Sequence, residues 1–600
     1  MRNDMKRKWL VAVGCLALVV APLVLPDFYT TLLIYTGLAS IVVLGLVVLT
    51  GVGGMTSFGQ ATFVGLSAYT TGAISTTLGW SPWVTLPIAV LLTCLAAAVI
   101  GLLTVRLSGH YLVLGTVAWS VGLYYLFGNL PFLGGYNGIS DIPPITFFGF
   151  SLAGSRPSYY LIWAVVAVAV VCTMNLLDSR TGRAIRSLRN PVLAESFGID
   201  IYRLRLPVFI YAAFLAAISG WLYAHYFRFV NPAPFGFDGS IDYAFMLVLG
   251  GATQVFGAIV GAFVLVVGKM LLQIGLTHVL PGPVHWDQIF FGLLIIGLFH
   301  HARSGILSAR RMGAASPDNH EADTEDTVWI PAEIPCRFSS SQANALAAQP
   351  SATLRVEKVS RRFGSLLAVN GVSFDAAPGQ VVGVIGPNGA GKSTLFNLIA
   401  GTLSVDQGEV WLGEHCLSRL SPHQVIRHRV ARTFQHVQLR PGQSVLSNVA
   451  LGAHWLGRKG FIASLLRLDR HEERMLKARA MAAIERAGLK DVAFADAHTL
   501  PLGRQRVVEI ARALSASPSV LLLDEPAAGL RHQEKRALGA LIQQLREEGL
   551  TVLIVEHDME FLMDLVDKIV VVNFGTKLCE GMPQTVQSDP QVIETYLGAE

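Results

Sequence analysis

Long apolar runs dominate the first 311 residues of the chain. A bilayer core of about 30 Å needs about 20 apolar residues in a helix, and nine stretches approach that length with few charges. They are Trp9–Leu25, Thr30–Leu49, Gln60–Leu78, Leu86–Leu107, Tyr111–Phe127, Tyr160–Leu177, Leu206–Phe227, Ala244–Leu272 and Val284–Leu298. Soluble folds have no place for so many uncharged helices, so the pattern predicts a polytopic α-helical membrane domain.

Basic residues between these stretches predict the orientation of the domain. Cytoplasmic loops carry an excess of Lys and Arg, and such residues cluster at the N-terminus, in the loop 178–205 and after residue 302. Six stretches precede the loop, which fits its cytoplasmic side, but three follow it, so one of these three should fail to cross. We expect the glycine-interrupted Leu247–Gly268 to be re-entrant or broken, which leaves about eight crossings.

The pattern changes after residue 311. Residues 312–352 are rich in Ser, Ala, Asp and Glu without apolar periodicity, which is typical of a flexible linker. From residue 353, β-branched runs alternate with helical ones, as a parallel α/β sheet requires. We therefore divide the chain into a membrane domain (1–311), a linker (312–352) and an α/β domain (353–600).

Charge and cysteine content support this division. Residues 1–311 hold 17 Lys and Arg and 9 Asp and Glu, or about 8% charged, whereas residues 312–600 hold 29 and 32, or about 21%. In soluble domains roughly 25% of the residues are charged. The net charge of +5 comes from the apolar part, which argues against nucleic-acid binding. Six cysteines without any C-x-x-C pair indicate neither a disulfide framework nor a zinc site.

A phosphate-binding loop follows an expected strand, Gln380–Ile385. The sequence G-x-x-x-x-G-K-[ST] lies between that strand and an apolar helix, Leu395–Ala400. Its glycines let backbone N–H groups surround phosphate oxygens, and the helix N-terminus adds a positive dipole. Lys392 would contact the β- and γ-phosphates, and the Ser393 hydroxyl is placed for Mg²⁺. The predicted ATP contacts are Gly386, Asn388, Gly389, Gly391, Lys392, Ser393 and Thr394.

Two further strands end in polar residues. The apolar run Ser519–Leu523 leads into Asp524 and Glu525. A carboxylate at the end of a buried strand is unfavourable unless a cation compensates it, so we expect Mg²⁺ on Asp524 and water activation by Glu525. The strand Thr551–Glu556 delivers His557 to the same edge of the sheet.

These residues resemble the ATPase domain of ABC transporters over about 245 residues. The resemblance implies a P-loop α/β fold, ATP hydrolysis, and specific roles for three more positions. Gln435 corresponds to the Q-loop glutamine, which contacts Mg²⁺ and senses the membrane subunit, and His557 to the switch histidine at the γ-phosphate. Phe363 occupies the position where the family stacks an aromatic ring on adenine; a core-filling phenylalanine is the alternative.

One family motif is degenerate. The signature L-S-G-G-Q should precede the helix Val507–Leu514, but only Leu500 and Gly503 match it, while Pro501 replaces the serine and Arg504 the glutamine. In this family each signature completes the ATP site of a paired ATPase domain. The resemblance therefore implies one competent site, at Lys392, and one impaired site on a different partner, or two impaired sites if the domain pairs with itself.

The membrane part resembles the permeases of branched-chain amino acid importers. The resemblance rests on the segments 51–69, 106–111, 134–139 and 182–261, and the ATPase tail 589–598 resembles an ATPase subunit of the same systems. It implies a permease fused to an ATPase in the bacterial inner membrane, with the N-terminus and the ATPase in the cytoplasm. It also implies a second permease, a second ATPase and a periplasmic or extracellular solute-binding protein.

The cytoplasmic loop is expected to couple the two domains. In such importers a short helix of this loop docks beside the Q-loop, and the matching positions are Arg183, Pro191, Glu195 and Gly198. Pro191 can begin a helical turn whose apolar face is Val192, Leu193 and Phe197. A loop that is basic only because it is cytoplasmic is the alternative.

The expected function is ATP-driven import of branched-chain amino acids. Two alternatives stay open: an importer of urea or short amides, and an exporter or an ATPase-impaired regulatory membrane protein. Few ionisable residues lie in the apolar stretches, and Asp242, Lys269 and Asp287 are expected near their ends. A small amino acid is the expected solute, and membrane lipid the surrounding partner.

Overall fold

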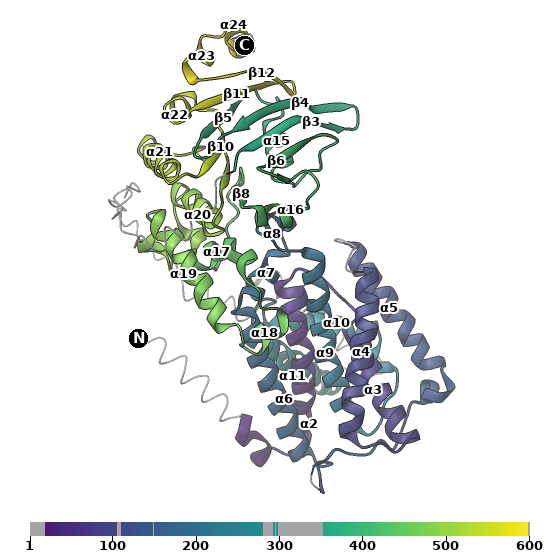
Figure 1. The fold of residues 1–600 in the computed structure, drawn as a ribbon. Coiled ribbons are helices and arrows are strands. Elements are labelled where there is room, and N and C mark those ends of the chain that lie inside the picture. The colour runs from purple at the N-terminus through teal and green to yellow at the C-terminus, as the bar shows by residue number, and fades with distance from the viewer. Residues whose placement is uncertain are drawn as a thin grey trace. The chain divides into compact units, whose positions relative to one another are not determined.

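The computed structural model describes residues 18–104, 110–147, 149–279 and 352–597, with a few residues between 292 and 300. These residues form two compact units (Figure 1). The first is built from the described parts of Met1–Arg189, Tyr202–His320 and Leu465–Arg467. The second is built from Asn190–Ile201 and the described parts of Glu321–Ser464 and Leu468–Glu600. The predicted linker, 312–352, lies almost wholly outside the described residues.

The first unit is a bundle of apolar helices (Figure 1). Helix α2 continues into a π-helical turn, η1, and packs against α6, α10 and α11. Six of the described helical spans are long and apolar enough to cross a membrane, which confirms the predicted polytopic membrane domain. The elements are α2 (Asp27–Leu46), η1 (Val47–Val52), α3 (Gln60–Thr77), α4 (Pro82–Thr104), α5 (His110–Asn129), α6 (Ser155–Leu177), α9 (Ile201–Phe227), α10 (Phe237–Gly250) and α11 (Val255–Val279).

The stretch expected not to cross is interrupted, but it still contains a helix of spanning length. The chain leaves α10 at Gly251, whose φ of 102° is a conformation that side chains disfavour. At 14 residues, α10 is about 21 Å long, short of the bilayer core. The predicted break is therefore present. Helix α11 has 25 residues and is long and apolar enough to cross, so the failure of this stretch to cross stays a prediction. Because Trp9–Leu25 and Val284–Leu298 lie largely outside the described residues, about eight crossings stays a prediction.

Helices α10 and α11 approach one another through glycine backbones. A Cβ added to Gly250 would lie 1.8 Å from the Gly257 carbonyl oxygen, and one added to Gly261 would lie 1.8 Å from the Met246 carbonyl oxygen. Small residues of this kind let membrane helices pack closely. The same two helices are joined by Lys269 Nζ and Asp242 Oδ2, 3.4 Å apart. Asp242 lies outside the candidate membrane spans of the described residues, and Lys269 lies five residues before the end of the span Val255–Ile274.

The second unit contains a six-stranded sheet in the order β12-β11-β5-β10-β9-β8. Its strands β11, β5, β10, β9 and β8 are parallel, and β12 adds an antiparallel edge. Every residue of β5, β9 and β10 is buried, as helix-covered parallel strands require. The strands are β8 (Val430–Arg432), β5 (Val381–Ile385), β9 (Val520–Asp524), β10 (Thr551–Val555), β11 (Lys568–Asn573) and β12 (Thr576–Gly581). The predicted α/β fold is confirmed.

A second, antiparallel sheet has the order β4-β3-β6-β7. Its strands are β3 (Leu354–Phe363), β4 (Leu366–Ala376), β6 (Gln407–Leu412) and β7 (His415–Cys416). Helices α15 (Lys392–Ile399), α16 (Pro422–Val425), α20 (Leu502–Ser515) and α21 (His532–Glu547) complete the parts that carry the site. Because β5, β9 and β10 are parallel neighbours, the residues that follow them meet at one edge of the sheet.

Replacing Gly250 or Gly257 by Ala is expected to reduce the folded protein recovered from membranes. The added Cβ would lie against backbone atoms, and forcing extra volume into a packed site costs about 1–3 kcal/mol. Gly122→Ala, where no atom lies within 4 Å of the added Cβ, is the matched control. Size-exclusion profiles of detergent-extracted chains measure the effect, and equal recovery of all three variants would contradict the packing argument.

Candidate functional site

The phosphate-binding loop runs from β5 to α15. The Lys392 ammonium donates hydrogen bonds to the carbonyl oxygens of Gly386 (2.7 Å) and Pro387 (2.9 Å). Burial lowers the pKa of Lys392, while Glu525 and Asp524 oppose that shift. Gly391 has a φ of 99°, and a Cβ there would lie 2.4 Å from the Ala368 carbonyl oxygen. Helix α15 begins at Lys392 rather than at Leu395, so its N-terminus points its free N–H groups at the loop.

The outer part of this loop faces solvent. Asn388, Gly389 and Ser393 are exposed, and Thr394 is half-buried. The predicted contact residues therefore surround a space that is open to solvent, and the buried Lys392 ammonium lies at its inner end. This arrangement suits a polyphosphate that approaches from solvent.

Asp524 ends strand β9 as a buried carboxylate. It is 3% exposed, and its Oδ1 has no hydrogen-bond partner among the described residues. Burial raises the pKa of Asp524, and the Arg432 guanidinium, whose Nη2 lies 3.9 Å from Oδ2, opposes that shift. An unpartnered buried carboxylate oxygen favours a cation as ligand.

Three of the predicted catalytic side chains meet beside Asp524. The Gln435 amide donates to Glu525 Oε2 at 3.2 Å, and His557 Nε2 lies 3.1 Å from Glu525 Oε1. Glu525 has a φ of 48°, an uncommon left-handed conformation, and its backbone N–H donates to the Val555 carbonyl at 2.9 Å. Such strained positions cluster at functional sites. The turn thus directs Glu525 toward residues that come from two other strands.

Glu556 was not singled out in the sequence. Its Oε1 accepts a hydrogen bond from the Ala527 backbone N–H (2.6 Å), and its Oε2 accepts one from the His557 N–H (3.2 Å). Burial raises the pKa of Glu556, and these two backbone donors oppose that shift. It therefore ties the segment after Glu525 to the segment that carries His557. The sequence could have indicated this role, because Glu556 is an acidic residue directly after the apolar run 551–555.

Phe363 is not a core residue. Its side chain is 43% exposed at the end of β3, and the Arg361 guanidinium lies 5.2 Å from the ring centroid. An exposed ring that already contacts a cation offers a flat surface to a stacking partner.

The degenerate signature leads into helix α20. Pro501 occupies the N-cap position and contributes no side-chain hydrogen bond to the helix. The Arg504 guanidinium donates to Asp491 at 2.8 Å. A Cβ added to Gly503 would lie 2.4 Å from Glu534 Oε1, so a residue other than glycine would displace that carboxylate. Leu500 receives a hydrogen bond at its carbonyl from the Gln505 amide.

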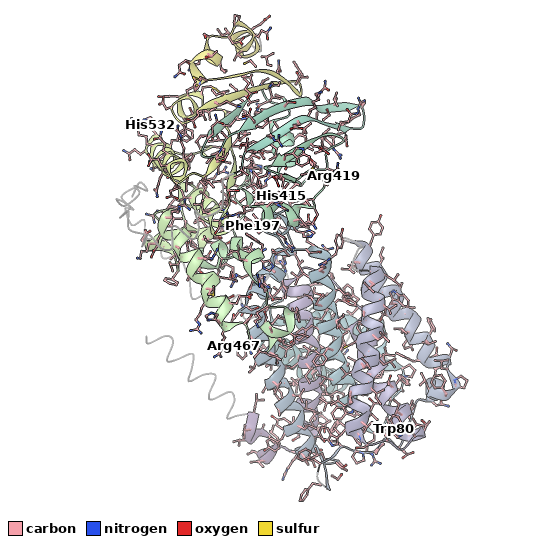
Figure 2. The ribbon with its side chains drawn as sticks, in the orientation of Figure 1. Trp80, Phe197, His415, Arg419, Arg467 and His532 are labelled. Atoms are coloured by element: carbon pink, nitrogen blue, oxygen red, sulfur yellow. The ribbon has the colours of Figure 1, made fainter. Side chains whose placement is uncertain are left out.

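Three of the four predicted coupling residues, Pro191, Glu195 and Gly198, lie in Asn190–Ile201, which belongs to the second unit and is named the coupling segment below. Asn190 caps helix α8 (Pro191–Ser196) by accepting from the Leu193 N–H at 3.2 Å, with Pro191 in the first turn as expected. Leu193 and Phe197 (labelled in Figure 2) are buried. Val192 is 49% exposed, so its predicted place on the apolar face is wrong.

The other predicted coupling residues do not all lie on helix α8 or in the same unit. Gly198 has a φ of 83°, and a Cβ there would lie 2.7 Å from Trp455 Cβ. Glu195 lies on α8, and its carbonyl accepts from the Gly198 N–H. Arg183 lies in the preceding helix, α7 (Arg180–Ser187), which belongs to the first unit, and it is buried.

A buried ion pair on α20 holds the backbone of Gln438. Arg512 and Glu509 lie 2.8 Å apart and are each 1% exposed. Glu509 accepts from the Gln438 N–H (2.9 Å), and Arg512 donates to the Gln438 carbonyl (2.8 Å). The Asn190 amide donates to Gln438 Oε1, and the Arg512 guanidinium lies 5.1 Å from the Phe197 ring centroid. The coupling segment and α20 therefore meet at a residue three positions beyond Gln435.

Sequence reasoning missed this pair. Both side chains lie in an amphipathic helix that carries two further arginines, Arg504 and Arg506, and nothing in their spacing marks them as buried. Burial raises the pKa of Glu509 and lowers that of Arg512, while each opposes the shift of the other. The pair is held by mutual charge and by the Gln438 backbone.

Three family models match the chain. Residues 28–299 match the permease component of the branched-chain amino acid transport system. Residues 369–528 match the ABC transporter model, and residues 576–600 match a branched-chain amino acid ATP-binding cassette transporter model.

Curated relatives cover the second half of the chain. The high-affinity branched-chain amino acid transport ATP-binding protein LivG of Escherichia coli (strain K12) is 41% identical over 248 residues, which are 41% of this chain and 97% of LivG. BraF of Pseudomonas aeruginosa, described in the same words, has the same identity and coverage. A solved nucleotide-free ATP-binding cassette from an ABC transporter aligns over 41% of this chain and 98% of its own, with 32% identity and a TM-score of 0.37.

Glu509→Ala and Arg512→Ala are each expected to destabilise the second unit by about 3–5 kcal/mol, because each leaves a buried charge without its partner. The double variant should lower the free energy of unfolding by less than the sum of the two single effects. Arg419→Ala is the control: Arg419 pairs with Glu409 at 2.8 Å but is 79% exposed (Figure 2), and such pairs contribute about 0–1 kcal/mol. Unfolding of the purified chain measures all four, and additive effects of the two alanines would contradict the proposed pairing.

Proposed function

The chain belongs to the branched-chain amino acid ABC transporter family, and we propose that it is the permease and ATPase component of an importer of branched-chain amino acids. ATP hydrolysis drives its transport. The proposed direction is into the cytoplasm across a bacterial inner membrane. The observation that carries the proposal is the convergence of Gln435, Glu525 and His557 beside Asp524, in a chain whose first unit matches the permease of the same system.

The residues at the site fit a magnesium ion. The unpartnered Oδ1 of Asp524 offers a buried anionic ligand, and Ser393 and Gln435 contribute neutral oxygens. When bound, the ion would neutralise charge on the β- and γ-phosphates of ATP. Mg²⁺ on these three residues is part of the proposal.

Each remaining residue has a separate task in hydrolysis. The backbone of Gly386–Gly391 and the Lys392 ammonium hold the phosphates, and Phe363 stacks on the adenine. Glu525 accepts a proton from the attacking water, and His557, hydrogen-bonded to Glu525, orients that carboxylate and contacts the γ-phosphate. The Gln435 amide donates a hydrogen bond to the other oxygen of the Glu525 carboxylate, which fixes the orientation of that carboxylate.

The proposed assembly needs partners. We assign residues 1–311 to the permease, 312–352 to a tether and 353–600 to the ATPase, with a second permease, a second ATPase and a solute-binding protein completing the importer. Pro501 and Arg504 in the signature position supply neither the serine hydroxyl nor the glutamine amide of the family motif. The proposal is therefore asymmetric: the ATP held by Lys392 is turned over, and the ATP held by the partner is turned over slowly.

Coupling in this proposal passes through Asn190–Ile201. The segment is continuous with permease helix α9 yet packs with the ATPase residues around Gln438. Movement of Gln435 on ATP binding would reach Gln438 three residues later, and from there Phe197 and Asn190. The physical link is the Gln438 backbone, which is held by α20 on one side and contacted by the segment on the other.

Glu525→Gln is expected to lower labelled-leucine uptake by about 10²-fold or more, because the amide cannot accept the water proton. The assay uses cells that express the intact chain with its partners. Glu547→Gln, an exposed position on α21, is the control and should leave uptake unchanged. Unchanged uptake in Glu525→Gln cells that contain the protein would contradict the proposed role.

Phe197→Ala is expected to reduce the leucine transported per ATP hydrolysed. The ring is fully buried against Arg512, and truncating a buried phenylalanine costs about 3–5 kcal/mol. Val192→Ala, an exposed position on the same segment, is the matched control. Uptake and ATP hydrolysis are measured together in proteoliposomes; an equal fall of both in Phe197→Ala would show damage to the ATPase and no coupling role.

A further inference from the structure

A short segment of the ATPase part, residues 457–470, exposes large apolar side chains. It contains helix α18 (Phe461–Leu465) and the turn that follows this helix. Ile462, Leu466 and Leu468 are 71%, 55% and 67% exposed. Single exposed apolar residues are normal on a surface in contact with water, but three large ones within seven residues indicate a surface that a partner covers.

The 457–470 segment is also basic on its exposed surface. Its four basic residues are all exposed: Arg458, Lys459, Arg467 and Arg470. Its one acidic residue is Asp469, which is buried and accepts a hydrogen bond from the Ser464 hydroxyl at 2.7 Å. The charge that this segment presents to a partner is therefore positive, and an anionic surface complements it.

Hydrogen bonds inside the segment and to helix α19 (Arg470–Arg486) fix its conformation. The Leu468 backbone N–H donates to the Ala463 carbonyl at 2.8 Å. Glu472 of α19 accepts hydrogen bonds from the backbone N–H groups of Arg458 (2.9 Å) and Lys459. The apolar and basic side chains are thus held on the outside of a defined structure.

Part of the segment lies at the end of a membrane helix. Leu465–Arg467 groups with the first unit, and the Leu465 carbonyl accepts a hydrogen bond from the Asn175 amide at 3.4 Å. Asn175 lies near the C-terminal end of α6, which is long and apolar enough to cross a membrane. The arginine-rich loop 178–205 follows α6 at once, so this end of α6 is the one expected at the cytoplasmic surface.

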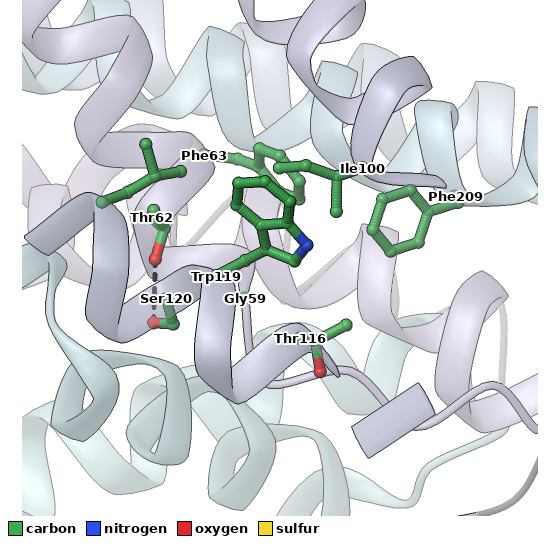
Figure 3. Close-up of a pocket in the computed structure, with 9 residues that line it drawn as sticks. Gly59, Thr62, Phe63, Ile100, Thr116, Trp119, Ser120 and Phe209 are labelled. Carbon is green, nitrogen blue, oxygen red and sulfur yellow. Dashed lines mark hydrogen bonds between the residues drawn. The ribbon is translucent and has the colours of Figure 1, made fainter. Parts of the chain in front are cut away.

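Helix α6 is apolar and exposed up to this contact. Val168, Val171 and Met174 are exposed on it, and on a membrane-spanning helix such side chains face lipid. The interior of the unit offers little space by comparison, because the pocket among α3, α4, α5 and α9 (Figure 3) has room for about one water molecule. Acyl chains therefore surround α6, and lipid headgroups lie where its apolar span ends, beside Asn175 and Leu465.

We propose that the 457–470 segment binds the surface of the bilayer. Its basic side chains contact the phosphate groups of anionic lipids, and Ile462, Leu466 and Leu468 enter the boundary between headgroups and acyl chains. Elements that combine Lys and Arg with large apolar residues lie in this boundary, and each basic residue near an anionic surface strengthens binding by about fivefold. The proposal rests on the proposed function only where the cytoplasmic leaflet is concerned.

Photo-crosslinking identifies what covers the segment. Benzoylphenylalanine, a photoreactive amino acid, is placed at Leu466 of the full chain, which is purified with any subunits bound to it and reconstituted into lipid nanodiscs. Phe494, 78% exposed and outside the segment, is the matched control position. Mass spectrometry separates lipid adducts from protein adducts. Lipid adducts at position 466 but not at 494 support the proposal, whereas adducts with protein alone, or none at 466, overturn it.

The basic side chains have a test of their own. In nanodiscs with equal amounts of phosphatidylglycerol and phosphatidylcholine, adducts at position 466 should favour the anionic lipid by about fivefold or more. Arg467→Gln combined with Arg470→Gln should bring this ratio close to one. Arg355→Gln combined with Arg419→Gln, both exposed and outside the segment, is the matched control and should keep the ratio. A ratio near one in the unchanged chain, or the same ratio in both double variants, overturns the anionic partner.

Neither readout requires transport. Lipid adducts form whether or not the chain moves leucine, so cells that take up no leucine would refute the proposed function and leave the lipid contact standing. Leucine uptake by a chain that forms no lipid adduct at position 466 would overturn the lipid contact alone. Equal ATP hydrolysis by all variants in detergent shows that each has folded, because these positions lie outside the ATP site.

Discussion

An acidic side chain can remain at the end of a buried strand only if positive charge lies next to it. Asp524 is in that position: every residue of its strand is buried, the nearest guanidinium nitrogen lies 3.9 Å away, and one carboxylate oxygen has no partner among the described residues. Arg432, Arg506 and Lys392 oppose the effect of burial on its pKa, whereas the adjacent Glu525 adds to it. The cation proposed for this site would compensate the negative charge of Asp524, so nucleotide and cation binding would stabilise the folded second unit.

The same logic extends to the coupling segment. The Glu509–Arg512 pair is buried more deeply than Asp524, but there each charge compensates the other and the Gln438 backbone bonds to both side chains. A buried pair of this kind adds little net stability. Its physical effect is geometric: it fixes the Gln438 peptide, three residues from Gln435, against α20, and the Arg512 guanidinium also contacts the Phe197 ring.

The sequence predicted the parts that depend on local chemistry. The strand, loop and helix around Lys392 and the polar ends of two apolar runs were sufficient to place Asp524, Glu525 and His557, because parallel strands bring such ends together. What depends on tertiary packing was missed. The six-residue helix did not indicate that Val192 is exposed, although the glycine-interrupted run did predict the break at Gly251. Charged residues within an amphipathic helix gave no sign of burial at Glu509 and Arg512.

The two units differ in where their ionisable side chains lie. Lys392, Asp524, Glu525 and His557 gather at the sheet edge of the second unit, whereas the apolar helices of the first unit carry few ionisable side chains. The ionisable groups available for ATP hydrolysis therefore lie in the second unit. The segment Asn190–Ile201, which is continuous with helix α9, packs in that unit against residues that include Gln438 and Trp455.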